Sequence, residues 1–498
     1  MTQKPWLRAY PPGVPAEIDP DRYASLRDLI EASFARFGPA PAFENLGTKL
    51  SYADVDRSSR AFAAYLQSLP GVEKGERVAV MMPNTLQSPI AIFGVLRAGL
   101  IVVNVNPLYT VPELEHQLAD SGARVILVLE NFAHTVQHAL PNTQVKHVVV
   151  TKVADHLPWP QRVAVNFVVK HVQRRVRPWH IPGAVAYRDA LARGAGSPFK
   201  RPELNGTDVA FLQYTGGTTG RAKGAMLTHR NMVANTLQCA AWVAPFYDAG
   251  AGVIITPLPL YHVYSLTANL LCFLETGGHN VLITDPRDMH AFLKLWRHTR
   301  VGFMTAVNTL FAGLLNTPGF ADLDFSALRV SMGGGMAVQR EVAERWHAVT
   351  GVPIAQGYGL TEASPVVSGN PLNVDSFNGS VGLPFPSTEV SIRDEAGGEL
   401  TTGEVGEICV RGPQVMAGYW GRPEETAHVM FDGGWLRTGD VGHMDTIGYI
   451  FIEDRIKDVI VVSGFKVYPN EIEDVAASQA GVREVAAVGV PDKQSGEA

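Results

Sequence analysis

Residues 77–106 read RVAVMMPNTLQSPIAIFGVLRAGLIVVNVN, which is an apolar run, a helical pattern and a second apolar run. The pattern predicts a strand over 77–82, a helix over 88–100 and a strand over 101–106. Strands that are apolar throughout are covered on both faces, so the alternation indicates a parallel sheet between two layers of helices. Further strand-like runs follow at 124–129 (RVILVL) and 147–150 (HVVV).

The alternation continues to residue 332, and the character of the sequence changes after Val381. There, short runs broken by Gly, Pro and Asp predict antiparallel hairpins or a small barrel. A further hairpin is expected over 454–469, followed by a helix from near Asn470 and a strand within 482–492. The apolar runs between 208 and 332 are DVAFLQY (208–214), GVIITPL (252–258), NVLIT (280–284), VGFMT (301–305) and LRVSM (328–332).

The composition of the 498 residues is that of an ordinary globular protein, with 46% hydrophobic and 18% charged residues. The formal net charge of −6 does not favour nucleic acid as a partner. The N-terminus has no apolar signal core, and no uncharged apolar run reaches the length of a membrane span. The widely spaced Cys239, Cys272 and Cys409 form no disulfide or metal pattern, which favours a reducing, cytoplasmic location.

The strongest local motif is QYTGGTTGRAKGAMLTHRNM, residues 213–232. It follows an apolar strand and combines glycines, threonines and Lys223. Glycine allows backbone N–H groups to surround a phosphate, while hydroxyl groups and a lysine add further contacts. The spacing differs from that of a Walker loop. The alternative is a flexible Gly/Thr turn, which the density of the motif disfavours.

Four further glycine- or acid-containing segments lie downstream. GGGMAV (333–338) would let a flat ring lie against backbone, although three glycines also suit a tight turn. GYGLTEASP (357–365) offers a carboxylate for Mg²⁺, or only a helix cap. WLRTGDVGHMD (435–445) and EDRIKD (453–458) offer an acid and a base, and the acid also suits a turn.

Together these motifs resemble the acyl-adenylate-forming superfamily, and most closely bacterial long-chain fatty acyl-CoA synthetases. Gly216 and Ala222 match the bacterial form of the phosphate loop, and residues 434–458 resemble a signature segment of those enzymes. The resemblance implies an α/β fold. A large N-terminal domain (1–456) holds two αβα parallel-sheet subdomains and a small distorted β-barrel (about 381–456). The start of a small, mobile α+β C-terminal domain (457–498) follows.

The resemblance also assigns roles to individual residues. It implies that Thr215 and Glu362 hold magnesium and that, with Lys223 and His262, they carry the catalysis. A lone His in an apolar stretch is otherwise more often a core residue. Lys457 matches the hinge, Gly464 leaves room for pantetheine, and His262, Val307 and Asn308 border the acyl pocket. The nucleotide would contact Tyr214, Thr215, Gly216, Gly217, Thr218, Thr219, Gly220, Lys223, Gly335, Gly357, Tyr358, Thr361, Asp440 and Arg455.

The implied reaction joins a long-chain fatty acid to coenzyme A, with ATP and Mg²⁺, through an acyl-AMP intermediate. Two other functions stay open: transfer of the acyl group to another acceptor, and binding of nucleotide without catalysis. The family continues to a Gly-Lys motif beyond the segment that ends at Ala498, so we expect impaired adenylation by these 498 residues. The sequence leaves chain-length preference open, and also the oligomeric state, for which a homodimer is one option.

Residues 161–179 (QRVAVNFVVKHVQRRVRPW) combine an apolar helical pattern with five basic residues. Val165, Val168, Val169, Val172 and Val176 have helical spacing, which is compatible with a helix lying on an anionic membrane. The alternative is a helix packed on the domain with a solvated basic face. The membrane interpretation would place the protein peripherally on the inner membrane.

Overall fold

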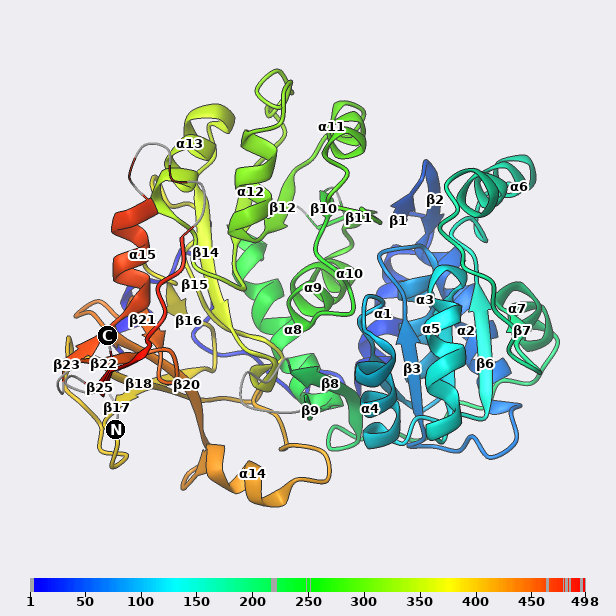
Figure 1. Ribbon diagram of the computed structural model, residues 1–498, viewed down its shortest axis with the longest axis horizontal. Coiled ribbons are helices and arrows are strands. Elements are labelled where there is room, and N and C mark those ends of the chain that lie inside the picture. Colours follow the sequence, from blue (N-terminus) through cyan, green and yellow to red (C-terminus); the bar gives the residue numbers. More distant parts are fainter. Residues whose placement is uncertain are drawn as a thin grey trace.

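The computed structural model describes residues 4–215, 222–247, 249–250, 252–462, 465–477, 479, 482, 485–492 and 496–497. Four β-sheets organise this part of the chain, with helices packed on the two largest (Figure 1). None of its helices combines the length and apolar character that a membrane crossing requires.

The seven-stranded sheet confirms the parallel architecture predicted from residues 77–150. Its pairs are parallel except for the last, where β8 and β9 form an antiparallel hairpin. The strands in spatial order are β7 (Val185–Ala186), β6 (His147–Thr151), β5 (Val125–Leu129), β3 (Arg77–Met81), β4 (Ile101–Asn104), β8 (Val209–Thr215) and β9 (Lys223–Thr228).

Alternate side chains of β3 enter different cores, as the pleat of a strand requires. Val78 and Val80 pack with the helices α2 (Tyr52–Gln67), α3 (Gln87–Arg97) and α7 (Tyr187–Ala195). Ala79 and Met81 pack on the opposite face with α4 (Val111–Ser121) and α5 (Ala133–Ala139). The sheet is therefore buried on both sides, which explains its continuous apolar strands.

The nine-stranded sheet is built in the same way and contains the predicted strands between 253 and 333. Its central strands are parallel, while β14/β15, β15/β16 and β1/β2 pair antiparallel. The order is β16 (Leu383–Pro384), β15 (Val366–Gly369), β14 (Ile354–Gly359), β13 (Val330–Gly333), β12 (Phe303–Ala306), β10 (Val253–Thr256), β11 (His279–Leu282), β1 (Pro41–Asn45) and β2 (Thr48–Ser51).

Two helical layers cover this sheet. Buried residues of α11 (Met289–Arg297), α12 (Asn308–Leu315) and α13 (Arg340–Thr350) pack on one face. On the other, α8 (His229–Val243) and α10 (Cys272–Thr276) form a core with Trp242 and Phe273. A capping box fixes the start of α8, because Thr228 and Asn231 exchange side-chain-to-backbone hydrogen bonds.

The region expected to be barrel-like forms a five-stranded antiparallel sheet. Within the described residues, β17 and β21 do not pair, so the sheet does not close into a barrel. Residues 383–384, at the start of the expected barrel, form β16 of the nine-stranded sheet instead. Its strands are β17 (Glu389–Arg393), β18 (Gly406–Arg411), β20 (Trp435–Met444), β19 (Met430–Phe431) and β21 (Ile450–Arg455).

The last segment holds the expected hairpin and helix in a small four-stranded sheet. The elements are β22 (Ile460–Val462), β23 (Phe465–Val467), α15 (Pro469–Ala477), β24 (Pro491–Asp492) and β25 (Gly496–Glu497). The strand expected within 482–492 is reduced to β24. Val482, Val488 and Val490 are 41–73% exposed, and a strand needs a neighbour to satisfy its backbone groups.

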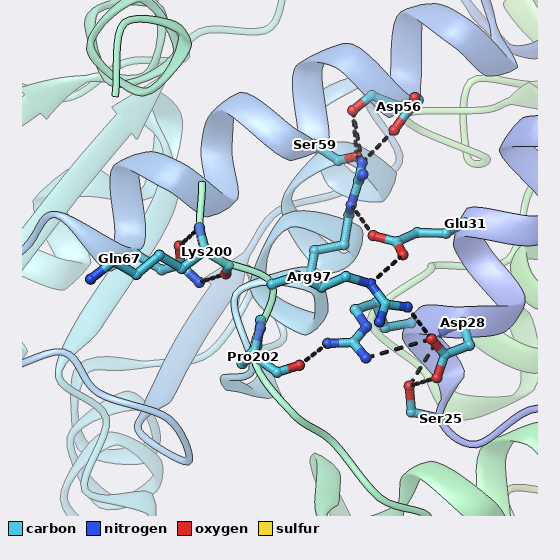
Figure 2. Close-up of polar contacts among 11 residues, drawn as sticks. Ser25, Asp28, Glu31, Asp56, Ser59, Gln67, Arg97, Lys200 and Pro202 are labelled. Atoms are coloured by element: carbon cyan, nitrogen blue, oxygen red, sulfur yellow. Dashed lines mark hydrogen bonds and ion pairs between the residues drawn. The ribbon is translucent and has the colours of Figure 1, made fainter. Parts of the chain in front are cut away.

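A cluster of charged side chains joins α1 (Leu26–Phe37), α2, α3 and the segment 200–202 (Figure 2). Arg97 of α3 is 3% exposed, and its Nη1 lies 2.6 Å from Asp56 Oδ1 and 3.0 Å from Ser59 Oγ. Its Nε lies 3.3 Å from Glu31 Oε1, and Glu31 also binds the Nε of Arg201 at 3.1 Å. These contacts fix α1 and the 200–202 segment against the helices of the seven-stranded sheet.

Candidate active site

A single cavity of about 710 Å³ opens at the carboxyl ends of strands in both large sheets. This is where parallel α/β sheets usually bind ligands. Residues that end β8, β13 and β14 line it, and β20 and β21 of the five-stranded sheet form a further wall. Three of the four sheets therefore contribute to one site.

One end of the cavity holds the described part of the phosphate-loop motif. Thr215 ends β8, Lys223 begins β9, and the two are directly paired in the hairpin. The predicted contacts Gly216, Gly217, Thr218, Thr219 and Gly220 lie outside the described residues. Tyr214 does not line the cavity; its hydroxyl donates to Asp120 Oδ2 at 2.7 Å, and burial, reinforced by that carboxylate, raises the pKa of Tyr214.

Glu362 lines the cavity next to this hairpin, within a short 3₁₀ helix (Thr361–Ala363). Its Oε1 accepts a hydrogen bond from the Tyr419 hydroxyl at 2.6 Å. Burial, together with the Glu362 carboxylate, raises the pKa of Tyr419, so the phenol stays protonated and donates. Thr361 lines the same wall. The structure thus brings the predicted Thr215, Lys223 and Glu362 together.

The predicted nucleoside contacts form a second group in the same cavity. The Tyr358 hydroxyl donates to Asp440 Oδ2 at 2.5 Å, and Arg455 Nε lies 3.1 Å from Asp440 Oδ1. Burial raises the pKa of Asp440, while Tyr358 and Arg455 oppose that rise. The side chain of Asp440 is therefore held by a donor on each oxygen.

The glycines of this wall allow a close approach to backbone. Gly335 has a φ of +80°, which disfavours a side chain. A Cβ on Gly357 would lie 2.9 Å from Met332 Cε, so the end of that side chain would have to shift. Both line the cavity, so a flat ring can rest there against peptide planes.

His262 lines the cavity, whose wall holds polar residues and a separate cluster of apolar ones. It is open to the cavity, but the surrounding walls shield it from bulk water, and this desolvation lowers its pKa. A neutral imidazole at neutral pH follows. The apolar part is lined by Cys239, Trp242, Val243, Ala268, Cys272, Phe303, Met332, Val366, Leu372 and Phe385.

Two predicted acyl-pocket residues do not line this cavity. Asn308 is 7% exposed, and its Oδ1 accepts the backbone N–H of Gln339 at 3.1 Å. Val307 caps the start of α12 beside Gly335. Their role in the structure is to position the turn that carries Gly335. Sequence spacing places them after a strand but does not show which way they face.

The predicted hinge residue Lys457 lines the cavity just after β21. Gly464 lies outside the described residues. Several cavity residues were not predicted, among them Tyr419, Trp242 and Arg437. The α8 residues that line the apolar part have the i, i+3, i+4 spacing of any buried helix face, so no local signal separates a ligand wall from a core.

The chain is a member of the AMP-binding enzyme family, because the model of that family matches residues 30–420. At the level of individual proteins, the chain is 54% identical over 496 residues to a long-chain-fatty-acid–CoA ligase of Salmonella typhimurium. That match covers 100% of this chain and 88% of the relative. A ligase with the same description from Bacillus subtilis is 39% identical, again over 100% of this chain and 88% of the relative.

The fold also matches solved structures. ATP-bound MatB from Rhodopseudomonas palustris superposes with a TM-score of 0.80 at 28% identity, covering 95% of this chain and 87% of that one. A benzoate CoA ligase from Burkholderia xenovorans gives a TM-score of 0.78 at 25% identity, covering 94% and 87%. The implied α/β fold of acyl-adenylate-forming ligases is therefore confirmed.

Proposed function

We propose that the protein is an ATP-dependent long-chain fatty acid–CoA ligase that works through an acyl-AMP intermediate. The observation that carries the proposal is one cavity lined by both the predicted nucleotide contacts and a cluster of apolar residues. We place His262 at the junction of these two parts. The two relatives described as long-chain-fatty-acid–CoA ligases are 54% and 39% identical over the full chain. The apolar part is suited to a hydrocarbon chain, and the junction to its carboxylate.

The first step joins the fatty acid carboxylate to the α-phosphorus of ATP and releases pyrophosphate. Negative charge builds up on the phosphoryl oxygens, so positive groups accelerate the step. Lys223 lines the cavity at the phosphate-loop hairpin, where the triphosphate would bind. Arg455 lies beside Asp440, whose carboxylate would accept the ribose hydroxyls. Tyr358 and the glycine wall would support the base.

The donor set fits a Mg²⁺ ion that arrives with the nucleotide. Mg²⁺ is usually bound by one or two carboxylates together with phosphate oxygens and water. Here the Glu362 carboxylate and the Thr215 hydroxyl line the same end of the cavity. Such an ion would neutralise charge on the triphosphate.

In the second step the thiol of coenzyme A attacks the acyl-AMP and AMP leaves. We assign residues 1–456 to a large domain and 457–498 to the start of a mobile small domain. Between the two steps the small domain would rotate about Lys457, its hinge. Gly464 would leave room for the pantetheine arm. Such a rotation is a lid-type conformational step. His262, neutral and at the junction, would border the thiol's path.

The proposal predicts thioester formation from palmitate or oleate that needs ATP, Mg²⁺ and coenzyme A together. The measurement is the acyl-CoA product, alongside pyrophosphate release with and without coenzyme A. Fatty-acid-dependent pyrophosphate release without thioester would instead indicate a different acyl acceptor. ATP binding with no pyrophosphate release from any fatty acid would indicate a binding protein and reject the ligase.

We also propose that the helix over 159–172 is a membrane-contact surface. It comprises α6 (Trp159–Phe167) and a π-helical turn (Val168–Val172), and lies at the outer end of the seven-stranded sheet (Figure 1). Its outward face is apolar: Trp159, Val163, Phe167 and Val172 are 54–70% exposed. A π turn keeps residues five apart on one face, so Phe167 and Val172 stay aligned.

This face differs from the valine stripe expected from the sequence. Val165, Val169 and Val176 are only half-buried against the protein, while Trp159 and Phe167 point outward. Arg174, Arg175 and Arg177, all exposed, follow directly. Exposed aromatic residues beside basic ones favour the interface of an anionic bilayer.

We expect Arg174→Glu/Arg175→Glu/Arg177→Glu, and separately Trp159→Ser/Phe167→Ser, to weaken binding to vesicles containing anionic lipid. Each basic residue near such a surface contributes about 1 kcal/mol, so the triple variant should lose at least about tenfold in partitioning. Vesicle sedimentation measures it. Lys294→Glu/Arg297→Glu/Arg300→Glu, an equal charge change on the exposed face at α11, is the control. Equal binding by all variants would remove the surface from consideration.

A further inference from the structure

The segment 416–425 connects the five-stranded sheet to the phosphate-loop hairpin. Met226 and Trp420 donate backbone hydrogen bonds to Gly418 (2.8 Å) and Gly224 (2.8 Å), so the segment runs along the outer edge of β9. Met416 donates to the carbonyl of Glu362 at 2.8 Å. These bonds place the segment between Lys223 and Glu362.

The segment supplies a counter-ion to the phosphate-loop lysine. Lys223 Nζ forms an ion pair with Glu425, the third residue of α14 (Pro423–Val429), and lies 5.3 Å from the centre of the Tyr419 ring. Lys223 lowers the pKa of Glu425, which keeps the carboxylate charged at neutral pH. The lysine expected to meet phosphate is therefore occupied by a carboxylate of its own chain.

A second cation, Arg422, contacts the other carboxylate oxygen of Glu425. Arg422 Nη1 lies 3.5 Å from Glu425 Oε1, and Arg422 Nη2 lies 3.0 Å from Asp120 Oδ1. Asp120 also accepts the Tyr214 hydroxyl at 2.7 Å, which fixes it at the end of β8. Glu425 thus lies between two cations, one in the cavity and one anchored to the seven-stranded sheet.

We propose that Glu425 competes with the triphosphate of ATP for Lys223. When ATP binds, the triphosphate displaces the Glu425 carboxylate from Lys223 toward Arg422. The inference rests on the proposed function, because it needs ATP at the Lys223 end of the cavity. Phosphate oxygens that approach Lys223 place negative charge beside the Glu425 carboxylate. Like charges this close repel each other, and the Glu425 carboxylate can then pair with Arg422 alone.

The exchange predicts that removing the negative charge of Glu425 should tighten ATP binding. An ion pair between partly exposed groups is worth about two- to fivefold in an equilibrium constant. Glu425→Gln should lower the Kd for ATP by about that factor, since Lys223 is then free to meet phosphate. Isothermal titration of the protein with ATP in EDTA measures this without turnover.

Two comparisons make the test specific. Glu424→Gln removes the same charge from the same helix, and Glu424 has no ion pair to any residue that the structure describes, so its Kd should stay near that of the wild type. In a Lys223→Gln background, Glu425→Gln should no longer tighten binding. Raising the salt concentration should bring the Kd values of Glu425→Gln and wild type for ATP closer together, because salt screens exposed ion pairs.

Unchanged or weaker ATP binding by Glu425→Gln, with normal binding by the wild type, would overturn the exchange and leave the ligase proposal intact. Weaker binding would mean that Glu425 orients Lys223 for phosphate rather than competing for it. Failure of the wild type itself to bind ATP would overturn both proposals.

Discussion

Replacing Glu362 by Gln should reduce fatty-acid-dependent pyrophosphate release by about 10²–10³-fold, because a preorganised charged group at the reacting phosphates is lost. Glutamine keeps the size of the side chain and an oxygen that can accept the Tyr419 hydroxyl. The change therefore removes the charge and leaves the geometry. Since Mg²⁺ needs that charge, the variant should also require a higher Mg²⁺ concentration.

The control for this prediction is Tyr419→Phe, which removes the hydrogen bond but keeps the carboxylate. We expect a loss of about tenfold, near the lower end of the roughly 1.5–3 kcal/mol of one hydrogen bond to a charged group, because Glu362 lines an open cavity where water can replace the phenol. ATP binding in EDTA should be no weaker for Glu362→Gln than for the wild type, because without Mg²⁺ the carboxylate only repels the triphosphate. A Glu362→Gln enzyme with more than a tenth of wild-type activity would contradict the assigned role.

A second large effect is expected from the Arg97 cluster, on stability rather than activity. Replacing both Glu31 and Asp56 by Ala should lower the free energy of unfolding by about 3–5 kcal/mol. The reason is that the nearly fully buried guanidinium of Arg97 would lose both of its carboxylate partners. Urea denaturation measures the effect.

The opposite deletion should cost less. Arg97→Met leaves carboxylates whose side chains are 25% and 45% exposed and can be hydrated, so we expect a loss of about 1–2 kcal/mol from the missing hydrogen bonds. Arg57→Met is the surface control, because Arg57 is 73% exposed in its pair with Asp54, and should change stability by less than about 1 kcal/mol. The assignment of the cluster is wrong if Arg97→Met proves the more damaging change.

The parallel sheets could be predicted from the sequence because burial on both faces leaves a direct record. β3 and β5 are apolar at nearly every position, and their short length and valine content favour strands over buried helix segments. The phosphate-loop motif could also be recognised from the sequence, since Thr215 and Lys223 lie in one continuous stretch. The strand β9 and the direct pairing of Thr215 with Lys223 were not predicted.

Other parts of the site depend on contacts between distant segments and left no local record. Tyr419 meets Glu362 across 57 positions, and Asp120 meets Arg422 across 302. Both acids lie in sequence contexts that also suit surface positions. The open form of the 389–455 sheet was equally hidden, because a hairpin pattern specifies neighbouring pairs but not whether the outer strands meet.

Residues 416–420 also cover the edge of the seven-stranded sheet at β9. β9 is the last strand of the seven-stranded sheet, and a bare edge strand is a template on which other chains can add. The backbone bonds from Met226 to Gly418 and from Trp420 to Gly224 occupy that edge. The connection that carries Tyr419 to Glu362 therefore also caps the sheet, so substitutions that loosen it are expected to promote aggregation as well as impair catalysis.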